Sequence, residues 1–259
     1  MQEYEAGIIR TEYCGENIYV IHLACKEIAR EAVPGQFVQV KVGNSTDPFL
    51  RRTFSLYGVN RERGLVKLVI DVIGRGTEQI TAVKRGQCLN IIGPLGKGFD
   101  RNINTSKPVV LVAGGIGVAP LLFLTESLQT SGHRQLFFFM GARTESAHNS
   151  FKELFPLKLE VYHSSDDGSV GYSGYISDLL EEKLDSIKPG VIYACGPHLM
   201  MKAVATIADK FGILCQVSLE ERMACGLGAC YGCAVRLRDG RMVRSCVDGP
   251  VFYAKEVKW

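Results

Sequence analysis

The stretch Val109-Val-Leu-Val-Ala-Gly-Gly-Ile-Gly-Val-Ala-Pro120 runs from an unbroken apolar segment through a glycine-rich turn into the start of a helical pattern. Apolar residues at every position, rather than at alternate ones, are typical of a strand buried on both faces of a parallel sheet. Similar apolar runs occupy residues 135–140, 159–162 and 191–194, and helical patterns occupy residues 120–129, 176–184 and 199–211. This alternation of strands and helices predicts an open parallel α/β sheet.

The residues before this stretch show short strand-like segments that glycine and proline divide. Residues 36–42 alternate between apolar and polar side chains, and residues 65–73 form a longer run rich in β-branched residues. Shorter segments of the same kind lie at residues 19–24 and 89–92. Several short strands at this spacing predict a closed antiparallel β-barrel or a sandwich.

These patterns divide the chain of 259 residues into three parts. We predict a β-barrel domain over residues 1–102, an α/β domain over residues 103–214 and a small C-terminal segment over residues 215–259. The polar residues 102–107 form the predicted linker between the first two parts. A chain of this length can bury a sizeable core in two domains.

Composition and charge exclude several classes of protein. The formal net charge is +3 and the basic residues form no stripe, so we expect no nucleic-acid partner. The first residues lack the apolar stretch of a signal peptide, and the longest uncharged run, residues 108–124, combines a strand, a turn and a helix start rather than a membrane span. Nine cysteines without an export signal favour a reducing compartment, so we expect a cytoplasmic protein.

The C-terminal part carries a cysteine motif, Met223-Ala-Cys-Gly-Leu-Gly-Ala-Cys-Tyr-Gly-Cys-Ala234, and a further cysteine at position 246. Cys225, Cys230 and Cys233 follow the C-x₄-C-x₂-C spacing of plant-type [2Fe–2S] sites, in which a fourth cysteine lies further along the chain. Asp239-Gly240 is a hairpin signal that would bring Cys246 back beside Cys233. The motif predicts a [2Fe–2S] cluster, and a structural Cys₄ zinc site is the main alternative reading of the same residues.

Two further motifs lie at the carboxyl ends of predicted parallel strands, the edge at which open α/β sheets bind ligands. The glycines of residues 114–117 would let the backbone approach a dinucleotide pyrophosphate at a helix N-terminus. The sequence differs from G-x-G-x-x-G, however, and suits a simple turn equally well. Cys195, followed by Gly196 and Pro197, could approach a nicotinamide ring, and the same residues could merely break the strand.

In the first part, Arg51-Arg-Thr-Phe-Ser55 places an arginine, an aromatic ring and a hydroxyl on one extended segment. Arg52 and Phe54 share a face by the two-residue period of a strand, and Ser55 lies on the other face. A guanidinium group suits a phosphate, and a serine hydroxyl can hydrogen-bond to the edge of a flavin. Gly76 and Thr77 precede a short helical pattern and offer N–H groups and a hydroxyl to a second phosphate. Each of these signals is weak alone.

The order of the motifs resembles the ferredoxin-reductase-like flavoproteins, which join an FAD-binding β-barrel to an NAD(P)-binding α/β domain. The resemblance spans roughly residues 5–212, and the family usually has tyrosine where this chain has Phe54. Only residues 234–245 separate the third and fourth cysteines, and the C-terminal segment is too short for a complete ferredoxin domain. This short cluster segment, with residues 93–99 and 165–169, resembles the electron-transfer subunits of class 1B dihydroorotate dehydrogenases.

The resemblance implies a set of cofactor-binding residues. FAD would be held by Arg52, Thr53, Phe54 and Ser55, bordered by Val69, Ile70 and Asp71, and bound at its pyrophosphate by Gly76 and Thr77. NAD would lie over Gly114, Gly115, Gly117, Ala119 and Pro120, with its nicotinamide near Cys195, Gly196 and Pro197. Cys225, Cys230, Cys233 and Cys246 would hold the [2Fe–2S] cluster. Arg143 could meet a 2′-phosphate, so the choice between NAD and NADP stays open.

The resemblance also implies a partner and a reaction. The partner would be an FMN-containing catalytic subunit that oxidises dihydroorotate in pyrimidine biosynthesis, within a heterotetramer of two copies of each chain. Electrons would pass from that FMN to the cluster, then to FAD and finally, as hydride, to NAD⁺. We expect no catalytic side chain from this chain. The alternative is an NAD(P)H-dependent flavin and iron–sulfur reductase component that serves another redox partner, such as ferredoxin.

Overall fold

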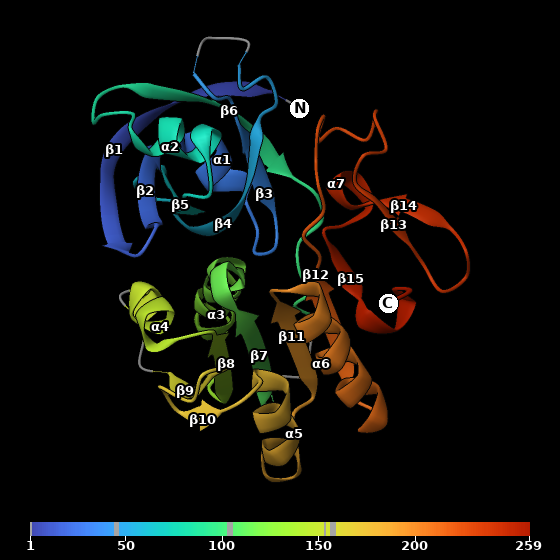
Figure 1. Cartoon of the computed structure of the whole chain (residues 1–259). Coiled ribbons are helices and arrows are strands. Elements are labelled where there is room, and N and C mark those ends of the chain that lie inside the picture. Colours follow the sequence, from blue (N-terminus) through green and yellow to red (C-terminus); the bar gives the residue numbers. More distant parts are fainter. Residues whose placement is uncertain (1, 44–46, 103–105, 153, 156–158) are drawn as a thin grey trace.

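The computed structural model describes the chain except for residues 1, 44–46, 103–105, 153 and 156–158. A β-barrel, an α/β domain and a C-terminal segment follow one another along the chain (Figure 1). The C-terminal segment lies beside both of the other parts. The predicted linker, residues 102–107, lies partly outside the described residues.

Six antiparallel strands form the closed barrel in the order β1-β2-β5-β4-β3-β6, which confirms the predicted barrel. The elements of this part are β1 (Glu3–Gly15), β2 (Ile18–Ala24), α1 (Lys26–Glu31), β3 (Phe37–Val40), β4 (Arg52–Asn60), β5 (Leu65–Asp71), α2 (Arg75–Thr81) and β6 (Cys88–Leu95). On β3, Val38 and Val40 are fully buried in the barrel core. Because side chains alternate along a strand, Phe37 and Gln39 point out of the barrel.

The second part is built on a seven-stranded sheet in the order β10-β9-β8-β7-β11-β12-β15. Its elements are β7 (Val109–Gly114), η1 (Gly115–Gly117), α3 (Val118–Thr130), β8 (Leu136–Ala142), α4 (Glu145–Lys152), β9 (Glu160–Ser165), β10 (Tyr172–Ser173), α5 (Ile176–Ile187), β11 (Val191–Cys195), α6 (His198–Lys210) and β12 (Leu214–Ser218). All neighbouring strands are parallel except β12 and β15, which confirms the predicted parallel α/β sheet.

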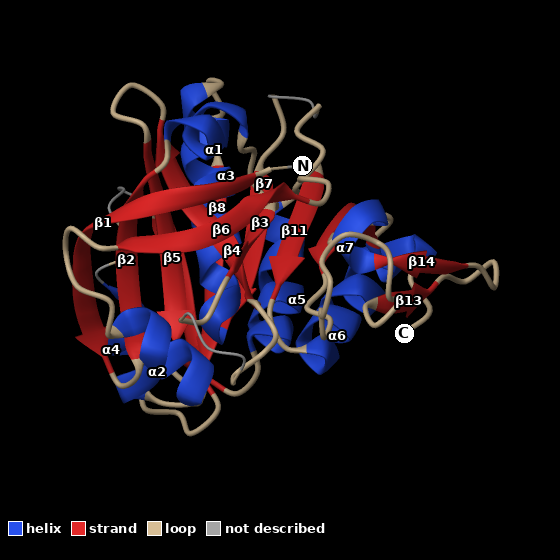
Figure 2. Cartoon of the chain, turned by 90° about the horizontal axis from the view of Figure 1, so that it is seen from above, coloured by secondary structure: helices blue, strands red, loops and turns tan. Residues whose placement is uncertain are grey.

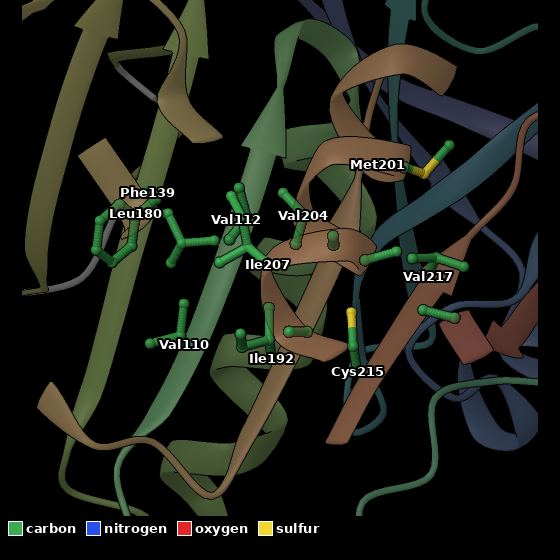
Figure 3. Close-up of a cluster of buried hydrophobic side chains, with 14 of the residues drawn as sticks. Val110, Val112, Phe139, Leu180, Ile192, Met201, Val204, Ile207, Cys215 and Val217 are labelled. Atoms are coloured by element: carbon green, nitrogen blue, oxygen red, sulfur yellow. The ribbon is translucent and has the colours of Figure 1, made fainter. Parts of the chain in front are cut away.

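Both faces of the sheet are buried, as the unbroken apolar run at residues 109–112 indicates. Val110 and Val112 pack with side chains of α5 and α6, as the close-up in Figure 3 shows for Val204 and Ile207. Val109 and Leu111 face the other way and pack with α3 and with barrel residues such as Val69. Among the helices of the described ranges, none has both the length and the apolar character to cross a membrane.

The C-terminal segment leaves the sheet at β12 and returns to it at β15. It contains β13 (Ala234–Arg236), β14 (Met242–Arg244), α7 (Ser245–Asp248), β15 (Val251–Tyr253) and η2 (Ala254–Glu256). Strands β13 and β14 pair as the predicted hairpin, and Figure 2 shows them projecting from the side of the molecule. The proposed division between residues 214 and 215 falls inside β12, and β15 pairs with that strand. The cysteine loop therefore joins two neighbouring strands of the sheet.

Candidate functional site

The four cysteines of the C-terminal motif lie as two pairs. The backbone N–H of Cys230 donates to Sγ of Cys225 at 3.4 Å, and that of Cys246 donates to Sγ of Cys233 at 3.5 Å. In the described part of the chain, no three His, Cys, Asp or Glu side chains converge as ligands of a single metal ion. Two thiol pairs supply the four thiolates that either a [2Fe–2S] cluster or a Cys₄ zinc site requires.

Backbone N–H groups are already directed at the sulfur atoms of this site. Leu227 donates to Sγ of Cys225 and Gly232 donates to Sγ of Cys230, both at 3.4 Å. Desolvation disfavours the Cys225 thiolate, but the N–H groups of Leu227 and Cys230 lower the pKa of its thiol to about 6. Desolvation, followed by the hydrogen bond with Cys233, raises the pKa of Cys246 to about 11. Such donors offset the charge of four thiolates, so the donor set fits a [2Fe–2S] cluster.

The cysteine loop packs against the outer face of the barrel. Cys233 and Cys246 are buried in an apolar cluster with Phe37, Ile92 and Leu95. Gly226 follows Cys225 with a φ of +66°, and a Cβ added there would lie 2.5–2.7 Å from the amide atoms of Gln39. The sequence motifs did not predict this contact with β3. The only signal for it is the polar position among apolar residues in the alternating run 36–42.

Arg52, on β4, lies against the start of α2. A Cβ added at Gly76 would lie 2.5 Å from Nε of Arg52 and 2.7 Å from Nη2, so the guanidinium group packs directly on this glycine. The Thr77 hydroxyl donates to the Gly74 carbonyl at 2.8 Å and accepts from the Ile73 N–H at 3.1 Å, so it fixes the first turn of α2. A guanidinium group beside backbone N–H groups fits a pyrophosphate.

The remaining residues of the predicted flavin strand are half-buried. Thr53 lies opposite Gln39 and Ser55 lies opposite Phe37 in the β3–β4 ladder. Phe54 packs against the barrel core. Thr53 and Ser55 therefore share the outward face that also contacts the cysteine loop.

Val69, Ile70 and Asp71 occupy three different environments at the end of β5. Val69 packs with the core of the α/β domain, whereas Ile70 is fully buried inside the barrel. The Asp71 carboxyl is half-buried, and desolvation raises its pKa. The side chain of Ile70 is therefore turned away from any ligand between the domains, and only its backbone could border one.

The two α/β motifs meet at the carboxyl edge of the sheet, where β7 and β11 are neighbours. A Cβ added at Gly117 would overlap the carbonyl oxygen of Cys195, so this glycine packs directly on the β11 backbone. Gly114 packs similarly on Pro197, since a Cβ there would lie 2.7 Å from Cδ of the proline. Gly115 has a φ of +52° and open space around its Cα, so its backbone stays accessible to a phosphate. Gly196, Ala119 and Pro120 complete the closely packed surroundings of this turn.

The Cys195 thiol is not suited to proton transfer. Desolvation, with a smaller contribution from the Glu220 carboxylate, raises the pKa of this buried thiol far above its ordinary value. A buried, protonated thiol is a weak nucleophile and a weak base.

Arg143, after β8, has an exposed side chain, and its carbonyl accepts from the Asp167 N–H at 3.3 Å in an acidic turn.

A closed six-stranded barrel followed by a parallel α/β sheet defines the ferredoxin-reductase type of flavoprotein fold. The chain is similar to an NADH-dependent reduced ferredoxin–NADP oxidoreductase of known structure, with a TM-score of 0.87, 29% identity and coverage of 99% of this chain and 90% of the other. A ferredoxin reductase of carbazole 1,9a-dioxygenase shares the fold with a TM-score of 0.69 and 20% identity, over 82% of this chain and 66% of that one.

Sequence comparison gives a narrower assignment. Residues 220–258 match the iron–sulfur cluster binding domain of dihydroorotate dehydrogenase B, and residues 111–206 match the oxidoreductase NAD-binding domain. The electron transfer subunit of dihydroorotate dehydrogenase B (NAD(+)) from Desulforamulus reducens is 38% identical over 99% of this chain and 98% of the relative. The corresponding Enterococcus faecalis subunit is 35% identical over 96% of both chains. The chain belongs to the family of dihydroorotate dehydrogenase B (NAD(+)) electron transfer subunits.

Proposed function

We propose that this chain accepts electrons from an FMN-containing subunit that oxidises dihydroorotate, and delivers them to NAD⁺. The observation that carries the proposal is the packing of the paired cysteines on the outer face of β3, next to the strand that carries Arg52 and Ser55. A one-electron centre and a flavin must lie close together if electrons are to pass between them. Membership of the family, over nearly the whole chain, supports the same function.

Each cofactor has a set of residues that would hold it. Arg52 and the backbone at Gly76 would bind the FAD pyrophosphate, while Thr53 and Ser55 would face the flavin with their hydroxyls. The cluster, when bound, supplies one-electron transfer, and the flavin converts single electrons into hydride for NAD⁺. Phe37, Ile92 and Leu95 contribute by excluding water from the Cys233–Cys246 pair.

The nucleotide would bind at the turn between β7 and α3. The accessible backbone at Gly115 would receive the pyrophosphate, and the nicotinamide ring would lie near Cys195 and Gly196, where Gly196 packs directly on the Gly114 backbone. The raised pKa of Cys195 supports a positioning role for this residue, because hydride transfer to NAD⁺ requires no proton from the thiol.

We place the partner interface around the cysteine loop. Leu227, Tyr231 and Val247 are exposed apolar side chains next to the cysteines in the sequence, and Arg236 and Arg238 are exposed on the hairpin that follows Cys233. Nε of Arg238 donates to the Val257 carbonyl at 3.4 Å. Exposed aromatic and apolar residues next to arginine are typical of protein interfaces. Charge reversal by Arg236→Glu should weaken association with the FMN subunit. Light scattering on the mixed subunits tests this and the proposed assembly of two copies of each chain.

The decisive experiment is NAD⁺ reduction driven by dihydroorotate. The chain is purified without oxygen, its flavin and iron contents are measured, and the matching FMN subunit is added. NADH should form only when both subunits are present. Absence of NADH, despite bound flavin, bound iron and active dye reduction by NADH, would refute the assignment to dihydroorotate oxidation.

A reductase component that serves ferredoxin is the second candidate. The similarity to the ferredoxin–NADP oxidoreductase chain, which covers 99% of this chain, favours it. Rapid reduction of a ferredoxin by NADH, without any response to the dihydroorotate-oxidising subunit, would support this function over the first. A cytoplasmic location suits both, because thiolate ligands and reduced cofactors persist in a reducing compartment.

A further inference from the structure

Gln39 is a buried amide between the two proposed redox sites. On one side its Nε2 donates to Oγ1 of Thr53, on the flavin strand, across a long hydrogen bond of 3.4 Å. On the other side the amide packs on Gly226, the residue after the first cluster cysteine. The neighbouring strands β3 and β4 and the distant cysteine loop therefore meet at one side chain.

This amide is unusual for its surroundings. Gln39 is 0% exposed, and its Oε1 accepts no hydrogen bond from the described residues. The neighbouring outward residues of this face, Phe37 and Ile92, are apolar. A buried acceptor without a donor destabilises a protein, and an apolar side chain of the same size would avoid this. The polar group at this position therefore points to a role other than packing.

We propose that Gln39 is a positioning residue for electron transfer, whose amide fixes the approach of the Cys225 loop to the flavin strand and tunes the reduction potential of the cluster. The inference rests on the proposed function, because it requires both cofactors to be bound. The contact with Gly226 sets how close the loop can lie to β3. Dipoles and hydrogen bonds near the ligand sulfur atoms are among the main determinants of cluster potential.

The first test compares Gln39→Leu with Gln36→Leu. Gln36 is a matched control, because its amide accepts from the Val33 N–H at 3.0 Å and donates to the Gly96 carbonyl at 2.8 Å in the same part of the barrel. Both variants are titrated with reductant while flavin absorbance and the electron paramagnetic resonance signal of the reduced cluster are recorded. Gln39→Leu should change the equilibrium constant for electron distribution between cluster and flavin about tenfold. This corresponds to a change of about 59 mV in the difference between their one-electron reduction potentials. An unchanged distribution, or the same change in Gln36→Leu, would overturn the proposal.

A second test uses the contact itself. Gly226→Ala inserts a Cβ against the Gln39 amide and also forces alanine into a φ of +66°, whereas Gly212→Ala meets the same backbone strain at +65° in open space. Gly226→Ala should lose more cluster than Gly212→Ala, and adding Gln39→Ala should restore part of that loss. Additive effects of the two substitutions would refute the contact.

These measurements distinguish a failure of the proposed function from a failure of the proposed role of Gln39. A wild-type chain that binds neither flavin nor iron would refute the proposed function before any variant is made. A wild-type chain with both cofactors, whose spectra and potentials do not respond to Gln39→Leu and whose double variant is additive, would refute only the role of Gln39.

Discussion

Replacing Gly117 with alanine should separate the nucleotide-binding turn from strand β11. The residue has an ordinary φ of −59°, so alanine is not strained by the backbone conformation. Its new Cβ would overlap the Cys195 carbonyl oxygen and lie 2.5 Å from the carbonyl carbon and 2.8 Å from the Gly196 nitrogen. These are backbone atoms, which cannot rotate away as a flexible side chain can. Ordinary contacts between carbon atoms lie at about 3.5–4.0 Å, so the two segments must move apart by about 1 Å.

The expected loss of stability follows from this displacement. Overpacking of a well-filled interior destabilises a protein by about 1–3 kcal/mol. For a chain of this size each 1 kcal/mol lowers Tm by roughly 2–4 °C, so the expected decrease is about 2–12 °C. A 1 Å displacement of a reacting group can slow a reaction about 100-fold, and Gly196 borders the proposed nicotinamide site. Dye reduction by NADH should therefore fall much more than the flavin and iron contents.

Calorimetry and NADH kinetics on purified holoprotein test this expectation. Gly7→Ala is the matched control, because a Cβ there meets only the Ala24 Cβ at 4.0 Å. Its stability should stay within about 0.5 kcal/mol of the wild type, as for most substitutions without steric conflict. A Gly117→Ala variant with the Tm and NADH kinetics of the wild type would refute the contact between the turn and β11.

Three further outcomes are expected. Arg52→Ala should purify with reduced flavin, measured by absorbance after desalting, because the guanidinium group beside Gly76 is lost; full flavin content would contradict the phosphate role. Cys233→Ser should lose iron, measured by chemical analysis, yet keep NADH-dependent dye reduction, whereas Cys88→Ser should keep both. Desolvation lowers the pKa of His163 below its ordinary 6.5, so its contribution to stability is fully present above that pH and is lost as pH falls below it. Urea unfolding at several pH values should show a smaller loss in His163→Phe; an identical pH dependence would exclude this residue as a source.

The sequence predicted the fold wherever local pattern and burial agree. The apolar run at residues 109–112 fills both faces of the sheet, and the alternating run at 36–42 forms a barrel strand. Strand β1 was missed because several of its positions are exposed and carry charged side chains such as Glu3, Glu5 and Arg10. Strands β12 and β15 were missed because they are short and pair with each other across the whole cysteine segment.

The residues of the candidate site also fall into two groups: those that a local sequence pattern predicts, and those that only the folded structure brings together. The spacing of Cys225, Cys230 and Cys233 predicts ligands because a cluster needs thiolates at short intervals along one loop. No local pattern predicts that Gln39 meets Gly226, or that Gly117 meets Cys195. Such contacts depend on the packing of segments far apart in the chain, so only the folded structure brings them together.

The antiparallel pairing of β12 and β15 has a consequence for how the metal-binding region can move and how it could be removed. Ser218 lies opposite Val251, and the Leu219 N–H donates to the Pro250 carbonyl at 2.9 Å, so the region is clamped at both ends at almost the same point. A loop closed in this way cannot move as a domain on a flexible tether. The electron-donating FMN subunit must therefore dock beside it. The same closure makes the region an insertion between two paired strands. A short reverse turn from Ser218 to Val251 would keep those strands paired, but it would also remove Val235 and Leu237 from the core that they share with α6.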